Sequence, residues 1–142
     1  MRKHITVNQA ISAVKIAGKA GLQVGAFFII GYPGENDNTI LQTLKLSSSL
    51  PLDYVSYALP YPFPGTGLYD KVKDQLLPIY WEPLEHGLMK HKLAFKSDFS
   101  ETKLEFALLK GITQFRHRKK RHLSIAYNIF DRATNLVFRM MR

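Results

Sequence analysis

The chain has 142 residues, of which 46% are hydrophobic and 22% charged, as is typical of one globular domain with its own core. It contains no cysteine, which excludes disulfides, thiolate zinc sites, a cysteine nucleophile and an iron–sulfur cluster held by this chain alone. The formal charge of +9 is concentrated in residues 116–142, which carry eight Lys or Arg against one acid, Asp131.

A capped helix and a buried strand are predicted first along the chain. Thr6 and Gln9 have the spacing of a capping box, apolar residues then recur at helical intervals, and Gly21 ends the pattern, so we expect a helix over residues 7–20. Residues 24–30 form a continuous apolar run rich in aromatic and β-branched side chains. Such a run indicates a strand buried on both faces, as in a parallel sheet.

A second helix and strand repeat this order. Asn and Asp residues at 36–38 offer caps for a helix that the Leu50-Pro51 step ends. Residues 54–59 are the next strand, which a proline-rich stretch terminates. The alternation predicts right-handed crossovers, a parallel sheet and therefore an α/β fold.

The remainder of the chain is predicted to be mainly helical. Thr66 caps a short helix that reaches residue 76, which closes a first part spanning residues 1–76. Residues 77–99 are an irregular, aromatic-rich segment. Residues 100–142 form a basic helical extension, with one helix capped by Ser100 and a last helix over 124–140.

Both predicted strands end in turns rich in glycine and proline, 31–35 (Gly-Tyr-Pro-Gly-Glu) and 62–66 (Pro-Phe-Pro-Gly-Thr). Ligands of parallel α/β folds gather at the carboxyl ends of the strands, so two such turns in succession favour a site there. One turn alone would be structural. Glu35 could orient its turn, favour the positive end of the next helix, or accept a hydrogen bond from a ligand.

These motifs carry a resemblance to a known family. The stretch 26–35 (Ala-Phe-Phe-Ile-Ile-Gly-Tyr-Pro-Gly-Glu) resembles the fifth-strand motif of radical S-adenosylmethionine (SAM) enzymes. Residues 53–57 and 62–69 resemble the sixth strand and its exit in the same enzymes. The likeness covers residues 5 to about 72 and is greatest to members that carry a cobalamin-binding domain ahead of the barrel.

The resemblance implies the C-terminal βα units of a partial (β/α)6 TIM-type barrel with parallel strands. In such enzymes a [4Fe–4S] cluster reductively cleaves SAM to a 5′-deoxyadenosyl radical, which abstracts hydrogen or works with cobalamin in methyl transfer. By motif position, Ile29 and Gly31 would lie along the adenine of SAM, and Glu35 would shape the loop. The end of the sixth strand, Tyr57, Ala58 and Leu59, would close the adenine side by backbone and apolar contacts.

The chain departs from the family in what it lacks. The cluster-binding Cys-x3-Cys-x2-Cys loop and the first four strands have no counterpart here. We therefore expect a fragment that supplies the adenine side of a SAM pocket, does not cleave SAM alone, and has the rest of the enzyme and a small-molecule substrate as partners. Alone, it is expected to be poorly soluble, oligomeric or partly molten, because its sheet edge is uncovered.

The basic run 116–122 has three interpretations: a solvated face or helix joint, a site for nucleic acid or another acidic partner, or contact with a membrane surface. Nucleic acid is not favoured as a partner. An amphipathic interfacial helix would use the apolar residues Ile125, Ile129, Phe130, Val137 and Met140.

Two alternative functions follow: a basic helical interaction module that binds nucleic acid or an anionic membrane, and another α/β barrel enzyme with a phosphate-binding strand-end turn. No apolar run reaches the roughly 18–20 residues of a membrane span, and the N-terminus lacks a secretory signal. The expected location is the cytoplasm, with peripheral membrane contact by the tail as an option. The five histidines lack metal-ligand spacing, and Asp70 and Asp74, close to lysines, indicate a solvated helix.

Overall fold

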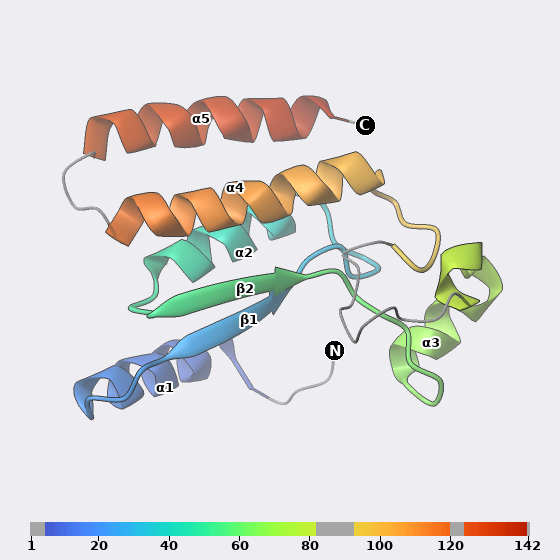
Figure 1. The fold of residues 1–142 in the computed structure, drawn as a ribbon, viewed down its shortest axis with the longest axis horizontal. Coiled ribbons are helices and arrows are strands. Elements are labelled where there is room, and N and C mark those ends of the chain that lie inside the picture. The colour runs from blue at the N-terminus through green and yellow to red at the C-terminus, as the bar shows by residue number, and fades with distance from the viewer. Residues whose placement is uncertain (1–4, 82–92, 120–123, 142) are drawn as a thin grey trace.

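A computed structural model describes residues 5–81, 93–119 and 124–141 as a mixed α/β fold. Two parallel strands alternate with helices and are followed by two long helices (Figure 1). In chain order the elements are α1 (Val7–Lys19), β1 (Gly25–Ile29), α2 (Asp37–Ser49), β2 (Tyr54–Ala58), α3 (Gly67–Val72), 3-10 turns at Lys73–Gln75 and Pro78–Trp81, α4 (Glu101–Lys119) and α5 (Ser124–Met140).

The helix starts follow from local side-chain caps. Thr6 and Gln9 form the predicted capping box of α1. Asn36 caps α2 and forms a second capping box with Thr39, so the predicted cap lies at the first of the three candidate residues. Thr66 accepts a hydrogen bond from the Tyr69 amide at the start of α3, as predicted.

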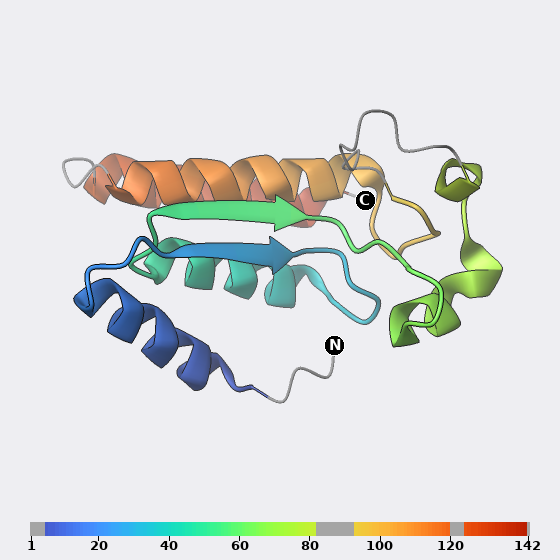
Figure 2. The same cartoon turned by 60° about the horizontal axis from the view of Figure 1, so that its bottom comes forward.

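The two strands pair in parallel, and α2 connects them. Their register runs from Gly25 opposite Tyr54 to Ile29 opposite Ala58. Side chains alternate between the faces of a strand, so Phe28 and Tyr57 share one face and Phe27 and Ile29 the other. In Figure 2 the strands lie in front of α2 and α4. These helices cover the face that carries Phe28 and Tyr57, since both side chains pack into the core with Leu44 and Leu104.

The prediction that residues 24–30 are buried on both faces is wrong for this chain. Phe27 is 77% exposed, because none of the described helices covers its face of the sheet. Helix α1 lies beyond β1 at the far side of the molecule from α5 (Figure 1), and none of its own residues is buried. The Phe27 face of β1 therefore has no covering helix among the described residues, and α1 contributes no buried residue.

The core lies between the sheet and helices α2, α4 and α5. Its fully buried members include Ile30, Ile40, Leu44, Leu104 and Phe138. Helix α4, from the predicted C-terminal extension, packs along α2 and β2, and α5 packs on α4. The last two helices thus belong to the same core as the strands.

The predicted irregular segment is partly described. Residues 78–81 form a 3-10 turn, and Leu76 makes an isolated antiparallel bridge with Phe95, which is buried. Residues 82–92, with His86 and His91, lie outside the described residues, as do residues 120–122 of the basic run and residue 123 after it. None of the described helices is long and apolar enough to cross a membrane.

Gly111 in α4 is a point of close contact between the helix and the sheet. A Cβ atom there would lie 2.6 Å from the Tyr57 ring and 2.8 Å from a Leu44 methyl group. We expect Gly111→Ala to lower the free energy of unfolding by about 1 kcal/mol, because overpacking of about 2 kcal/mol exceeds the gain of about 1 kcal/mol from helix propensity. Urea unfolding measures the change.

Gly18→Ala in α1 is the matched control. No atom lies within 4 Å of the added methyl group, so helix propensity acts alone there and the substitution should stabilise the chain slightly. Equal effects of the two substitutions would contradict the close contact at Gly111.

Candidate functional site

The two strand-end turns have the same backbone form. The Glu35 amide donates to the Tyr32 carbonyl at 3.0 Å, and the Thr66 amide donates to the Phe63 carbonyl at 3.1 Å. Each turn has proline at its second position and a glycine of positive φ at its third, with φ of 93° at Gly34 and 80° at Gly65. These are the residues that a type II turn requires.

Glu35 holds the first turn closed. Its Oε2 accepts from the Gly31 amide at 2.7 Å and from the Tyr32 amide at 2.9 Å. A carboxylate thus occupies the two amides that a ligand anion would use. Of the roles considered for Glu35, orienting its own turn is the one that these hydrogen bonds perform.

We expect Glu35→Ala to cost about 2 kcal/mol of unfolding free energy, because two charge-assisted hydrogen bonds to half-buried amides are lost. Chemical denaturation monitored by circular dichroism measures the effect. Glu105→Ala, at an exposed position on α4, should stay within about 0.5 kcal/mol of the parent. A similar cost at both positions would mean that the turn does not depend on the Glu35 carboxylate.

Gly31 joins this turn to α4. Its φ is 87°, and a Cβ atom would lie 2.9 Å from a terminal methyl group of Leu104. Glycine is therefore required twice, for its backbone conformation and for the approach of the helix. The strand exit is positioned by the core beneath it.

Ile29 and Ala58 are brought together on the uncovered face of the sheet. They are register partners at the carboxyl ends of β1 and β2, and both are half-buried. Phe27, two residues before Ile29, extends the same face. A small apolar platform therefore lies at the edge where the two turns begin.

Tyr57 and Leu59 lie on the opposite face. Both side chains are buried in the core, and the Tyr57 hydroxyl is 2.5 Å from the Ser47 hydroxyl. Burial raises the pKa of Tyr57, an effect that the Ser47 hydrogen bond partly offsets. Any contact of these two residues with a ligand on the uncovered face would have to use their backbone atoms.

The second turn lies against a group of aromatic rings. Tyr61 stacks on Tyr80 with ring centroids 5.5 Å apart and contacts Phe63 at 5.0 Å. Lys71 of α3 lies 5.8 Å from the ring centre of Tyr32, so α3 also contacts the first turn. The two turns are thus linked through side chains that follow the second strand.

Two hollows lie beside the first turn, one smaller than a usual ligand pocket and one lined by charged side chains that already pair with each other. One of about 180 Å³, between Tyr32 and Phe99, falls below the roughly 300–1,000 Å³ of ligand pockets. A second, of about 430 Å³, is lined by Asp37 and Lys103, which pair with each other at 2.8 Å. The uncovered face at Ile29 and Ala58 is therefore a better candidate than either hollow.

The part of the chain that the structure describes has no set of side chains suited to binding a metal ion. No group of three or more His, Asp or Glu side chains there could hold a metal ion. With no cysteine in the whole sequence, the chain does not provide the thiolates of an iron–sulfur cluster.

Comparison with known proteins gives one partial likeness to consider. No protein-family model matches the chain. Over 81 residues, 56% of its length, the chain is 38% identical to a Pyrococcus horikoshii protein described as an uncharacterized methyltransferase. The chain covers 18% of that protein's length, so the similarity is to one segment of a much longer chain.

Proposed function

We propose that this chain contributes two βα units of a SAM-binding barrel and forms the adenine side of the SAM pocket in a radical SAM enzyme. The observation that carries the proposal is the pairing of Ile29 with Ala58 on an uncovered apolar face, at the carboxyl edge of two parallel strands. This is the edge at which α/β barrels bind ligands. An adenine ring would pack on these side chains, while the two rigid turns fix the backbone around it.

The uncovered face, and an edge of β1 with which no described strand pairs, also support a partial barrel. A two-stranded parallel sheet buries too little surface to be a usual end state, and parallel sheets are normally covered on both faces. Further strands from another segment would pair with β1 and cover Phe27. That segment would also have to supply the cluster ligands, for which the chain has no residues.

The methyltransferase name of the relative supports a SAM-dependent reaction. Together with the resemblance to cobalamin-binding members of the family, it favours methyl transfer over other uses of SAM. A phosphate-binding turn is the weaker alternative, because Glu35 already fills the amides of Gly31 and Tyr32. A carboxylate at that position would repel a phosphate.

The first test is the genomic sequence ahead of the Met1 codon. An in-frame segment that encodes Cys-x3-Cys-x2-Cys is the expected result, and an unrelated neighbouring gene would contradict the proposal. Where the segment exists, the two parts are produced together under anaerobic conditions, and SAM binding is measured by equilibrium dialysis.

Ile29→Asp should weaken SAM binding at least about tenfold, since it places a charge against the adenine. Ile16→Asp, at an exposed position on α1, is the control, and assembly of the two parts is checked by gel filtration. Unchanged SAM affinity in an assembled Ile29→Asp protein would exclude this face as the adenine site.

A further inference from the structure

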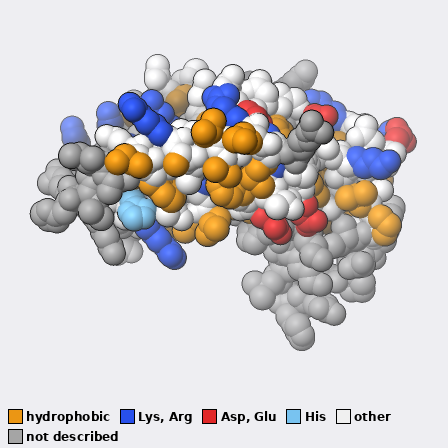
Figure 3. Space-filling model, turned by 90° about the horizontal axis from the view of Figure 1, so that it is seen from above, with side chains coloured by type: hydrophobic (Ala, Val, Ile, Leu, Met, Phe, Trp, Pro, Cys, Tyr) orange, Lys and Arg blue, Asp and Glu red, His pale blue; other side chains and the backbone are white. Residues whose placement is uncertain are grey.

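Helix α5 has two apolar faces, and the core explains only one of them. Phe138 is fully buried and packs toward α4 and α2. Ile129, Leu136 and Met140 are 65%, 62% and 74% exposed. Their spacing of seven and four residues places them on one side of the helix, opposite Phe138. They form an outward apolar stripe, which lies on the surface seen in Figure 3.

The structure changes the set of residues that forms the predicted interfacial face of α5. Phe130 is half-buried and its ring lies 5.7 Å from that of His117, so it belongs to the inner side of α5. Val137 is exposed beside the outward stripe, and the side chain of Ile125 lies outside the description. The stripe is therefore formed by Ile129, Leu136 and Met140.

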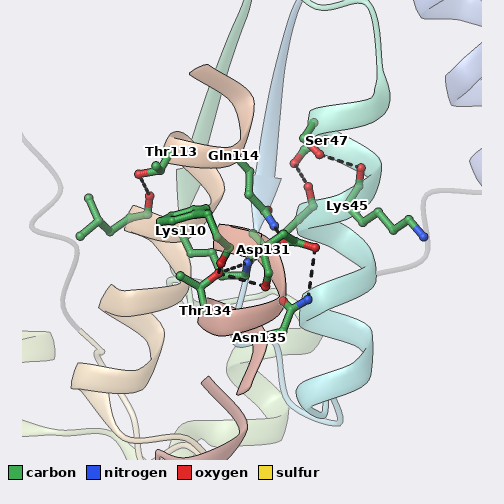
Figure 4. A network of polar contacts seen from close by, with 12 residues as sticks. Lys45, Ser47, Lys110, Thr113, Gln114, Asp131, Thr134 and Asn135 are labelled. Atoms are coloured by element: carbon green, nitrogen blue, oxygen red, sulfur yellow. Dashed lines mark hydrogen bonds and ion pairs between the residues drawn. The ribbon is translucent and has the colours of Figure 1, made fainter. Parts of the chain in front are cut away.

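Positive charge flanks the stripe. Arg132 is exposed on one side of it. Arg139, seven residues further on, is also exposed, but its guanidinium donates a hydrogen bond to Asn38 Oδ1 of α2 at 2.8 Å and is therefore already bound within the chain. The only acid of α5, Asp131, faces α4, where it pairs with Lys110 at 2.8 Å and accepts from Gln114 (Figure 4). The outward surface of α5 thus combines apolar side chains with the basic Arg132, and the single acid of the helix is held away from it.

The combination of apolar and basic side chains on α5 disfavours several kinds of partner. A dimer through this surface would bring the α5 helices of two copies together. Residues 116–142 carry a net charge of +7 in each copy, so electrostatic repulsion between the copies disfavours the dimer. Single-stranded nucleic acid would use aromatic faces for stacking and a duplex would use basic and polar side chains, whereas the stripe consists of Ile, Leu and Met. Additional strands would join at β1, and Figure 1 shows that edge on the side of the molecule away from α5.

We propose that α5 binds an anionic lipid surface, lying in the plane of the interface with Ile129, Leu136 and Met140 among the acyl chains. Apolar side chains enter the boundary between headgroups and chains, while Arg132 contacts lipid phosphates. The inner face stays packed on α4, so the helix needs no rearrangement. This inference is independent of the proposed SAM site.

Vesicle flotation of the whole chain tests the proposal. The chain should float with vesicles of phosphatidylcholine and phosphatidylglycerol, and much less with phosphatidylcholine alone. Ile129→Ser combined with Leu136→Ser should lower the bound fraction at least about tenfold, and Arg132→Gln about fivefold. Ile16→Ser on α1, at a position 67% exposed, should change it less than about twofold.

A second measurement places a probe on the stripe itself and leaves Ile129 and Met140 unchanged. Because the sequence has no cysteine, Leu136→Cys or Ile16→Cys gives a single labelling site for an environment-sensitive dye. Addition of anionic vesicles should shift the emission of the dye to the blue at position 136 and not at position 16. Circular dichroism checks that each variant keeps its helices.

Three results would overturn the proposal. The first is a parent chain that does not float with anionic vesicles. The second is flotation that Ile129→Ser and Leu136→Ser leave unchanged. The third is a dimer in sedimentation that these substitutions dissociate, without vesicle binding by the parent, which would assign the stripe to a second copy.

Discussion

Asp131→Ala is expected to destabilise the chain by about 3 kcal/mol. The substitution would leave the ammonium group of Lys110, whose side chain is 1% exposed, without its counter-charge. Thr134 would remain as a partner, since its hydroxyl accepts from Lys110 at 2.7 Å. Gln114 would lose the carboxylate to which its amide donates. Urea unfolding followed by circular dichroism measures the loss.

Joint replacement by apolar side chains is the control for this prediction. Lys110→Met with Asp131→Leu removes both charges, and buried pairs replaced in this way are often close to neutral in stability. We expect the double variant to unfold within about 1 kcal/mol of the parent. If it were as unstable as Asp131→Ala, the loss would come from packing between α4 and α5 and not from an uncompensated charge.

Sequence patterns predicted those elements whose signals are local. The capping box of Thr6 and Gln9, the cap at Thr66 and the proline after α2 each act within a few residues, so they mark the boundaries without knowledge of the fold. The apolar runs likewise predicted both strands and their parallel pairing. The turns at their ends were identified for the same reason, because Pro-Gly steps have one dominant backbone form.

Contacts between distant elements were not predictable in the same way. The two-residue period of a strand places Ile29 and Ala58 on one face of the sheet and Tyr57 and Leu59 on the other. The same period does not say which of the two faces a helix will cover. The same limit applies to Phe27, whose apolar neighbours suggested burial on both faces although the described helices cover only one.

The Lys110–Asp131 pair joins residues 21 positions apart on different helices. The sequence contains two signals that bear on it: Asp131 is the only acid in a basic stretch, and Lys110 lies among the apolar positions of α4. Neither signal alone identifies the partner, because a lone acid and a lone lysine are each compatible with a solvated helix face. Their pairing emerges only when α5 is placed on α4.

Gly31→Ala is expected to cost about 3 kcal/mol and to disturb the first turn of the candidate site. Alanine at a φ of 87° is strained by about 1 kcal/mol, and its methyl group would lie 2.9 Å from Leu104, whose buried side chain has little room to move. The displacement would reach Glu35 directly, because its carboxylate binds the Gly31 amide. Unfolding free energy and, in the assembled enzyme, SAM affinity should fall together.

Gly34, in the same turn, allows the cost of backbone strain to be measured without the clash against Leu104. Its φ of 93° imposes a similar backbone strain, but no atom lies within 4 Å of an added methyl group, so Gly34→Ala should cost only about 1 kcal/mol. In a Leu104→Ala background, Gly31→Ala should also cost about 1 kcal/mol, because the clash is gone and only the strain remains. If the cost at Gly31 stayed near 3 kcal/mol in that background, α4 would not be what positions the strand end.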